Sequence, residues 1–210
     1  MSPAPAARNS AGGDAGTVPR GGGREAITDA AREILAERGY HGTSIRDIAK
    51  HAGLSLSALY YWHPSKQHLL AALVEEITHD YFQRCDHALR HAGDDPAERL
   101  RALVHATVEY RVSRRVESNI ATLEWRNLEP GNRERLAGLR RAATGLWADL
   151  IADGVDRGVF HCPHPDDARR AIVASCNAIA QWYEPDGEIT PSELAERYTL
   201  IALHIVDHHG

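Results

Sequence analysis

The chain has 210 residues, of which 43% are hydrophobic, 25% are charged and only 6% are aromatic, and its formal net charge is −5. That length provides for one domain or two small ones with a sizeable core. No stretch approaches the roughly 20 apolar residues of a membrane span, and the N-terminus lacks the apolar run of a signal peptide. The three cysteines lie far apart without a C-x-x-C pair, which argues against a disulfide framework or a four-cysteine zinc site and favours a reducing cytoplasm.

The charge is distributed unevenly along the chain. Residues 1–66 carry eight Arg or Lys against six Asp or Glu, whereas the remainder carries sixteen against twenty-three. A slightly basic N-terminal region followed by an acidic remainder is compatible with a DNA-binding domain and a second region with another function. Surface charge, however, often serves only solubility.

Residues 1–23 are dominated by Gly, Pro and Ala, which supply fourteen of these positions. Such a composition cannot form a buried face, so we predict a disordered N-terminal tail. Its Arg8 and Arg20 either contact a phosphate backbone or belong to a plain solvated tail.

From Arg24 onward, apolar residues recur at helical spacing almost everywhere. A first helix is predicted from Arg24 to Gly39, and two short helices follow within residues 43–66. The later helices are predicted at Ser65–His91, from Pro96 onward, near Asn119–Asn127, over Leu136–Val155 with a stop at Gly158, over Ala168–Trp182, and over Leu194–Ile205. No segment alternates as a strand does, so the chain is predicted to be all-α.

Two of the helix starts carry a strong local signal. Asp95 and Thr190 are each followed by a proline at the first helical position and a glutamate two residues later. The Asp or Thr side chain caps the helix, and the glutamate favours the positive end of the helix dipole.

Residues 43–66 read TSIRDIAKHAGLSLSALYYWHPSK, which is the layout of a helix-turn-helix. Thr43 or Ser44 caps the first short helix, and Gly53 provides the positive φ that a tight turn requires. Ser55 caps the second helix, predicted over Leu56–Trp62. In a helix-turn-helix, the first residues of this second helix meet base edges in the major groove.

The predicted DNA contacts follow from this placement. Small residues at the start of the second helix are available to bases, and flanking hydroxyls and a lysine at a helix N-terminus are available to phosphates. The predicted DNA-binding residues are Ser44, Ser55, Leu56, Ser57, Ala58, Tyr60, Tyr61 and Lys66.

The order of these motifs resembles the N-terminal domain of the TetR family of bacterial transcription regulators. The resemblance runs from Ile27 to about Leu70 and comprises A-A-x-x-x-L, G-Y-x-x-T-S-I-x-x-I-A-x-x-A-G-L-S, L-Y and P-S-K. It implies a three-helix DNA-binding domain over residues 24–70, followed over residues 71–210 by a helical bundle for ligand binding and dimerisation.

Two positions depart from the family pattern. Leu56 stands where the family often has lysine, which removes a phosphate or guanine contact and favours a thymine methyl. His63 stands where a phenylalanine usually packs between the recognition helix and the next helix. We expect the side chain of Trp62 or His63 to fill that gap from a position shifted relative to the usual phenylalanine.

Other clusters favour neither a metal site nor catalysis. His161, Cys162 and His164 are three possible ligands in one loop, whereas structural zinc needs four that converge. The sequence has no G-x-S-x-G, phosphate loop or H-E-x-x-H. We therefore predict no cofactor, no metal and no enzymatic activity.

Polar side chains also accompany the apolar stripes of the central helices. Most are expected to face water, and a few to line a largely apolar cavity. This polar set comprises His105, Glu109, Tyr110, Arg111, Glu124, Trp125, Arg126, Asn177 and Gln181.

The C-terminal part has a second, less specific resemblance. Residues 123–128, with the pattern E-x-R-x-L, and the Gln181–Gly187 turn are similar to actinobacterial regulators of fatty-acid and steroid breakdown. This resemblance implies release from DNA by an acyl-coenzyme A thioester, with arginines for its phosphates and tryptophans beside its apolar part. The predicted ligand-binding residues are Tyr110, Trp125, Arg126, Arg140, Arg141, Trp147, Asn177 and Gln181.

The last two predicted helices carry small and apolar residues at helical spacing. Two copies of such a hairpin can form a four-helix interface about a two-fold axis, which suits a palindromic DNA site. The predicted interface residues are Ala171, Ser175, Ala178, Trp182, Tyr198, Ile201 and Ile205.

The sequence therefore predicts a cytoplasmic, homodimeric, ligand-responsive DNA-binding regulator without a membrane partner. It favours a repressor and leaves an activator as the alternative. Three alternatives stay open: a drug-like or free lipid effector in place of acyl-coenzyme A, a DNA-binding or protein-interaction module without small-molecule input, and an enzyme or metal-dependent module on a helical bundle.

Overall fold

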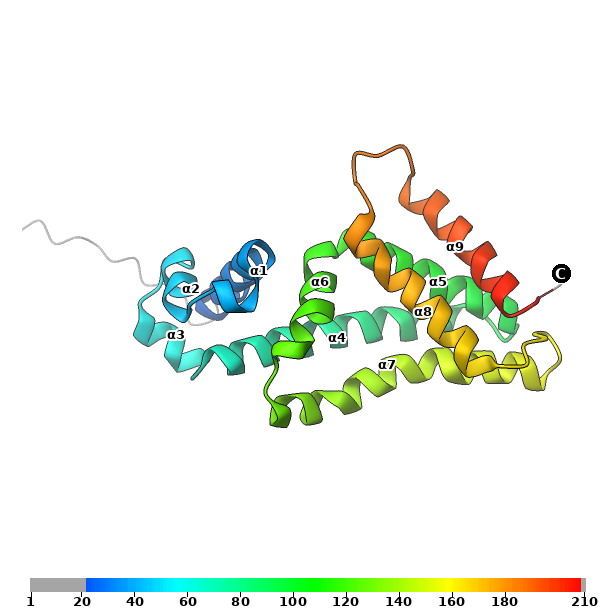
Figure 1. Cartoon of the computed structure of the whole chain (residues 1–210), viewed down its shortest axis with the longest axis horizontal. Helices are drawn as coiled ribbons and strands as arrows, with labels where there is room; N and C mark the ends of the chain where they lie inside the picture. The colour runs from blue at the N-terminus through cyan, green and yellow to red at the C-terminus, as the bar shows by residue number, and fades with distance from the viewer. Residues whose placement is uncertain (1–21, 209–210) are drawn as a thin grey trace, which may run out of the picture.

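The computed structural model describes residues 22–208, which form α-helices joined by short loops and, within that range, no strand (Figure 1). The all-α prediction is confirmed. The helices are α1 (Gly22–Gly42), α2 (Ile45–His51), α3 (Leu56–Trp62), α4 (Lys66–His91), α5 (Pro96–Ser113), α6 (Arg115–Leu123), the 3-10 helix η1 (Glu124–Asn127), α7 (Pro130–Asp156), α8 (Pro165–Trp182) and α9 (Pro191–Ile205).

Helix α1 starts before its predicted first residue, and its range continues to Gly42 past a break at Gly39. It begins at Gly22, so Gly22 and Gly23 belong to a helix rather than to the predicted tail. At Gly39 the backbone has φ 65 and ψ 176, which interrupts the helix where the sequence predicts its end. The remaining predicted tail, residues 1–21 with Arg8 and Arg20, lies outside the described residues.

The helix-turn-helix is built as the sequence predicts. The Ser44 side chain accepts a hydrogen bond from the Asp47 amide, and Asp47 accepts one from the Ser44 amide, which completes a capping box for α2. Gly53 has φ 66 in the turn, and Ser55 caps α3 by accepting from the Ala58 amide. These local bonds fix the angle at which α3 leaves α2.

Helix α4 connects the two halves of the molecule. It starts behind α3, capped by Ser65, and runs on into the bundle through the predicted domain boundary at residue 70 without a break (Figure 1). The core of the DNA-binding half includes Ile77 of α4 and also Ile120, Leu128 and Leu136 from farther along the chain. The two halves therefore share packed side chains.

The bundle has a second core centred on α5, which packs against α4, α7, α8 and α9. Trp147, Phe160 and Ile151 are among its fully buried side chains. Asp95 and Thr190 cap α5 and α9, as predicted.

The segment between α5 and α7 departs from its prediction. A short helix was expected near Asn119–Asn127, but α6 already begins at Arg115 and gives way to η1 at Glu124. Arg114 precedes α6 with φ −122 and ψ 47, and no side chain caps the helix. The start therefore lacks the capping side chain that marks α2, α3, α4, α5 and α9.

Candidate DNA interface and ligand pocket

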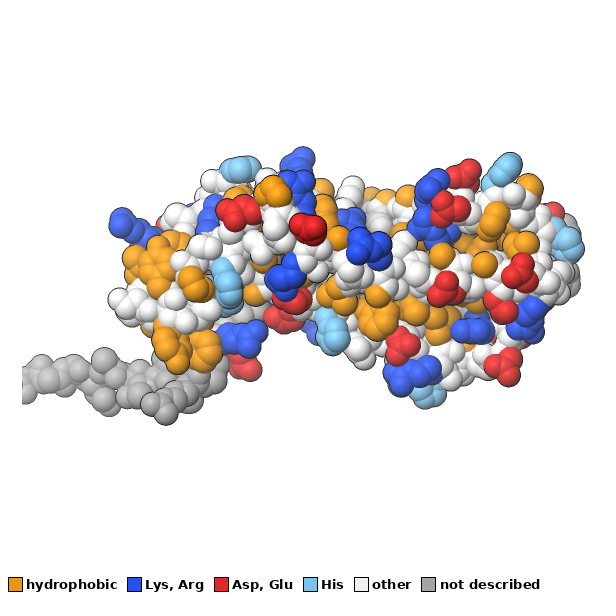
Figure 2. All heavy atoms as spheres, turned by 90° about the horizontal axis from the view of Figure 1, so that it is seen from below, with side chains coloured by type: hydrophobic (Ala, Val, Ile, Leu, Met, Phe, Trp, Pro, Cys, Tyr) orange, Lys and Arg blue, Asp and Glu red, His pale blue; other side chains and the backbone are white. Residues whose placement is uncertain are grey.

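Helix α3 presents one side to solvent and one to the core. Leu59 is fully buried, whereas Ser57, Tyr60 and Tyr61 are exposed, with Tyr61 at 80% of its full exposure. Figure 2 shows apolar side chains gathered at the end of the molecule that holds α2 and α3. Leu56 and Ala58 are half-buried at the start of α3. The accessible face combines hydroxyl groups with apolar surface, as contacts to phosphates and thymine methyl groups require.

The two capping serines differ in what they leave free. The Ser44 hydroxyl donates to Asp47 Oδ2 at 2.5 Å, so its proton is already engaged. The Ser55 hydroxyl accepts from the Ala58 amide at 3.1 Å, which leaves its own proton available. Ser55 is consequently the better placed of the two to donate to a phosphate.

His63 occupies the buried position behind α3, with only 3% of its side chain exposed. Its Nδ1 lies 3.2 Å from Nδ1 of His68, and its Nε2 has no partner. Burial, followed by the charge of His68, lowers the pKa of His63 to about 4. Trp62 is half-buried and lies beside Gly23 of α1. His63 thus fills the space behind α3 as a neutral ring.

Lys66 has an intramolecular role that the sequence does not predict. Its ammonium donates to the carbonyl of Tyr40 and lies 3.9 Å from the centroid of the Tyr40 ring. Partial burial lowers the pKa of Lys66. A phosphate contact by Lys66 stays a prediction. Arg46 and Lys50 of α2, which were not predicted, are exposed and have no ion-pair partner within residues 22–208.

A pocket of about 240 Å³ that opens to solvent lies between α4, α5, α6, η1, α7 and α8. Its lining combines apolar and aromatic side chains with hydroxyl, amide and guanidinium groups that could orient a ligand. The lining residues are Ile77, Thr78, Tyr81, Arg111, Ala121, Thr122, Trp125, Arg140, Ala143, Thr144, Trp147, Val173 and Asn177.

Half of the predicted ligand-binding residues line this pocket. Trp125, Arg140, Trp147 and Asn177 contribute to its wall, and the Arg140 guanidinium lies 4.6 Å from the Trp125 ring. The Oδ1 atom of Asn177 is buried and has no hydrogen-bond partner. Two tryptophans, an arginine and an amide are therefore brought together from three separate elements.

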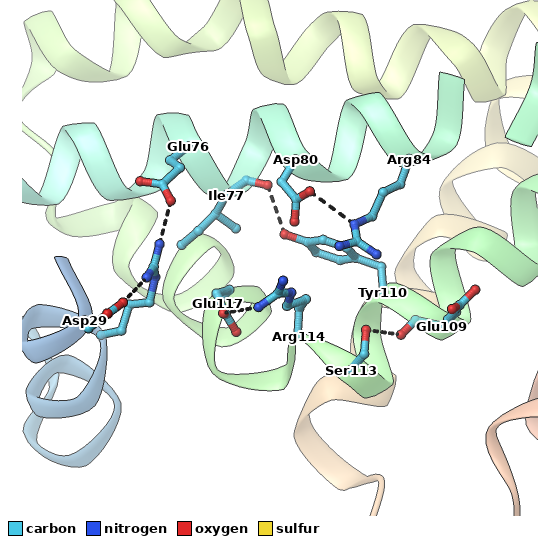
Figure 3. A network of polar contacts seen from close by, with 11 residues as sticks. Asp29, Glu76, Ile77, Asp80, Arg84, Glu109, Tyr110, Ser113, Arg114 and Glu117 are labelled. Carbon is cyan, nitrogen blue, oxygen red and sulfur yellow. Dashed lines mark hydrogen bonds and ion pairs between the residues drawn. The ribbon is translucent and has the colours of Figure 1, made fainter. Parts of the chain in front are cut away.

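The other four predicted residues do not line the pocket, and their role in ligand binding stays a prediction. Tyr110 is fully buried, and its hydroxyl donates to the Ile77 carbonyl (Figure 3). Arg126, Arg141 and Gln181 are exposed outside it. Successive helical residues point about 100° apart, so the neighbour of a lining residue faces elsewhere.

Arg111 also lines the pocket. It belongs to the polar set named above but was not among the predicted ligand-binding residues. Only 8% of it is exposed, and Nη1 donates to the Ser118 hydroxyl at 3.2 Å. Its guanidinium lies 4.5 Å from the Tyr81 ring, which also lines the pocket. Partial burial and the charge of Arg111 lower the pKa of Arg140.

The 3-10 helix η1 links the pocket to the DNA-binding half. Trp125 faces the pocket, whereas the Tyr40 amide donates to Glu124 Oε1 at 3.3 Å and Asn127 Nδ2 donates to Oε2 at 2.5 Å. Asn127 also bonds to His41 at 3.0 Å. One turn of helix therefore contacts both the pocket and the kinked end of α1.

Helix α4 provides a second link. Arg32 of α1 forms ion pairs of 2.6 Å with Asp29 and with Glu76 of α4 (Figure 3). Glu76 directly precedes Ile77 and Thr78, which line the pocket. A displacement of this part of α4 would therefore also shift α1 through the ion pair between Glu76 and Arg32.

Helices α8 and α9 leave an apolar face uncovered. Trp182 and Ile201 are each 46% exposed, and the rings of Trp182 and Tyr198 stack with centroids 6.5 Å apart. None of the predicted interface residues is fully buried in the single chain: Ala171, Ser175, Ala178, Trp182, Tyr198, Ile201 and Ile205.

Two further observations concern residues 22–208. No three His, Cys, Asp or Glu side chains of that range are grouped so as to hold a metal ion, and His161, Cys162 and His164 form no such group. No helix there has the length and apolar character needed to cross a membrane.

A helix-turn-helix surface joined to a helical bundle with a pocket is the architecture of a ligand-responsive DNA-binding regulator. A family model described as "Bacterial regulatory proteins, tetR family" matches residues 27–73, and one described as "Tetracyclin repressor-like, C-terminal domain" matches residues 93–206. The chain therefore belongs to the TetR family. It is a DNA-binding transcription regulator and not an enzyme.

Individual proteins resemble it over nearly their whole length. The HTH-type transcriptional repressor KstR2 of Rhodococcus jostii (strain RHA1) is 28% identical over 191 residues, covering 89% of this chain and 92% of that protein. A solved tetR-family regulatory protein from Rhodococcus RHA1 has a TM-score of 0.84 at 27% identity, covering 90% and 98% of the two chains. The ketosteroid transcriptional regulator KstR2 of Mycobacterium tuberculosis has a TM-score of 0.76 at 26% identity, covering 90% and 96%.

Proposed function

We propose that this regulator is a homodimeric repressor of the bacterial cytoplasm that binds a palindromic operator and is released by an acyl-coenzyme A thioester. The observation that supports this most is the pair of contacts made by η1, with Trp125 in the pocket wall and Glu124 bonded to Tyr40 of the DNA-binding half. The resemblance to a transcriptional repressor and a ketosteroid regulator supports the same conclusion.

In this proposal α3 enters the major groove. Ser57 and Ala58 stand at its start and read base edges, whereas Ser55, Tyr60 and Tyr61 contact phosphates and sugars. Arg46 and Lys50 of α2 add positive charge beside α3. Binding should weaken steeply as salt rises, because neutralised phosphates release counterions.

The second copy of the chain covers α8 and α9. The exposed Trp182 and Ile201 and the small residues Ala171 and Ala178 form a surface on which the same helices of a partner can pack. A two-fold axis through this surface places two α3 helices on one side of the dimer, as a palindromic site requires.

The acyl part of the effector occupies the pocket between Trp125 and Trp147. A cavity of about 240 Å³ is smaller than the roughly 300–1,000 Å³ of sites that enclose drug-sized ligands, so the coenzyme remains outside. Arg126 and Arg141 are exposed and directly follow pocket residues in the chain, where they can bind its phosphates. A free lipid or drug-like effector would not need these two arginines.

Release requires that the ligand bind one conformation of the dimer more tightly than the other. Occupation of the pocket displaces Trp125 and the Ile77 turn of α4. The contacts from Glu124 to Tyr40 and from Glu76 to Arg32 then carry this displacement to α1. The two α3 helices no longer match the spacing of the operator.

Footprinting on the DNA upstream of its own gene tests the DNA-binding half of the proposal. We expect one protected palindrome. Ser57 variants should change the preferred sequence, whereas Tyr60→Phe should weaken binding to all sequences alike. Folded dimer that protects no site in this DNA would contradict the proposal.

A further inference from the structure

The pocket contains a positive charge that the protein does not neutralise. Arg111 and Arg140 both line it, and no carboxylate of residues 22–208 lies within ion-pair distance of either guanidinium. None of the lining residues is an Asp or Glu. Arg111 is only 8% exposed, and a buried charge is normally paired, because an unpaired ion loses its hydration without compensation.

The neighbours of Arg111 hold the guanidinium without neutralising it. Its hydrogen bond goes to a neutral hydroxyl, that of Ser118, and its Nε is buried without a partner. The Tyr81 and Tyr110 rings lie 4.5 and 5.5 Å from it and contribute cation–π attraction. A fork of donors held beside two rings and lining a cavity is suited to bind a planar anion.

Arg140 lines the same pocket. It comes from α7, whereas Arg111 comes from α5, so the two charges meet only in the folded chain. Trp125 fixes the Arg140 guanidinium by stacking. Two arginines repel each other, and an anion between them removes that repulsion.

We infer that the part of the effector that enters the pocket carries a carboxylate of its own, separate from the thioester carbonyl, and that Arg111 and Arg140 bind it. This inference rests on the proposed ligand-gated function and specifies its ligand: an apolar body against Trp125 and Trp147 with an acid group at the arginines. The buried, unpartnered Asn177 carbonyl offers an additional contact to a hydroxyl of the same ligand.

The test compares acids with neutral molecules of the same length. Straight-chain carboxylates from hexanoate to dodecanoate and the corresponding primary amides are titrated into the full-length dimer, with calorimetry and tryptophan fluorescence as readouts. We expect at least one acid to bind about tenfold or more tightly than its amide, the usual effect of a charge-assisted hydrogen bond.

Variants assign the preference to the arginine. Arg111→Met should remove the advantage of the acid, and Arg111→Lys should restore part of it. Arg133→Met is the matched control, because Arg133 of α7 is exposed and lies outside the pocket. Circular dichroism verifies that each variant is folded, and Arg140→Gln, which changes an exposed residue, provides a second test should Arg111→Met unfold.

The inference is overturned if no acid of the series binds, if amides bind as tightly as acids, or if both arginine variants keep the preference. A gel shift with the upstream DNA keeps this result separate from the proposed function. Release of DNA by thioesters without any acid preference would remove only the carboxylate site. An acid preference without any DNA release would support the site and contradict the proposed switch.

Discussion

Replacement of Glu124 by alanine should loosen the junction between η1 and the DNA-binding half. Glu124 is 8% exposed and accepts two hydrogen bonds, from the Tyr40 amide and from Asn127. A hydrogen bond to a charged group contributes roughly 1.5–3 kcal/mol, but the variant also avoids the burial of a carboxylate. We therefore expect the free energy of unfolding to fall by about 1–3 kcal/mol.

Urea unfolding followed by circular dichroism measures this loss. With a slope of about 2 kcal/mol per molar urea, the midpoint should fall by roughly 1 M. Glu129→Ala is the matched control, because the Glu129 side chain is exposed and makes no capping bond to α7. Its midpoint should stay at the wild-type value.

Glu124→Ala should also separate ligand binding from DNA release. The pocket residues remain in place, so ligand affinity measured by tryptophan fluorescence should be unchanged. The ligand concentration that releases DNA should shift several-fold, because one of two contacts to α1 is lost. An unchanged midpoint together with unchanged release would refute the assignment of η1 as the connecting element.

Three further outcomes are expected. Gly154→Ala should lower the melting temperature of the bundle, because the added Cβ would lie 2.1 Å from the Phe160 ring. Gly145→Ala in the same helix places its Cβ more than 4 Å from any neighbouring atom and should raise the melting temperature. The pKa of His63, lowered to about 4, makes the folded state bind fewer protons than the unfolded state. Stability should therefore fall as pH drops from 6.5 towards 4. The free energy of unfolding, measured over this pH range, should fall less in His63→Phe than in the wild type. Ile201→Asp should yield monomers by light scattering, whereas persistent dimers would exclude α9 from the interface.

Most of the fold follows from short-range signals in the sequence. Ser44, Ser55, Ser65, Asp95 and Thr190 each cap a helix, and each is visible as a small polar residue ahead of an apolar stripe. Such signals act over three or four residues, so they need no knowledge of tertiary structure. Where no cap exists, as at Arg114 before α6, the predicted start was wrong by four residues.

The pocket could be predicted only in part, because its wall depends on how helices are rotated against one another. Trp147 lies on the apolar stripe of α7, so its inward direction follows from periodicity. Arg111 and Arg141 differ in a way that the sequence does not reveal. Arg111 faces the pocket because α5 is surrounded by other helices, whereas Arg141 lies on the exposed side of α7.

His63 illustrates a correct expectation whose detail required the structure. A residue at this site must fill the space behind α3, and the choice between His63 and Trp62 depends on where α1 lies. With Gly23 of α1 beside Trp62, the indole stays at the edge and the imidazole is buried.

A gel shift of the protein on its upstream DNA, titrated with acyl-coenzyme A thioesters and the matching free acids, tests the regulator's function most directly. We expect a discrete complex that a thioester dissolves at the concentrations that saturate the pocket. A complex that forms but responds to no thioester and no acid, or the absence of any specific complex with folded dimer, would contradict a ligand-released repressor.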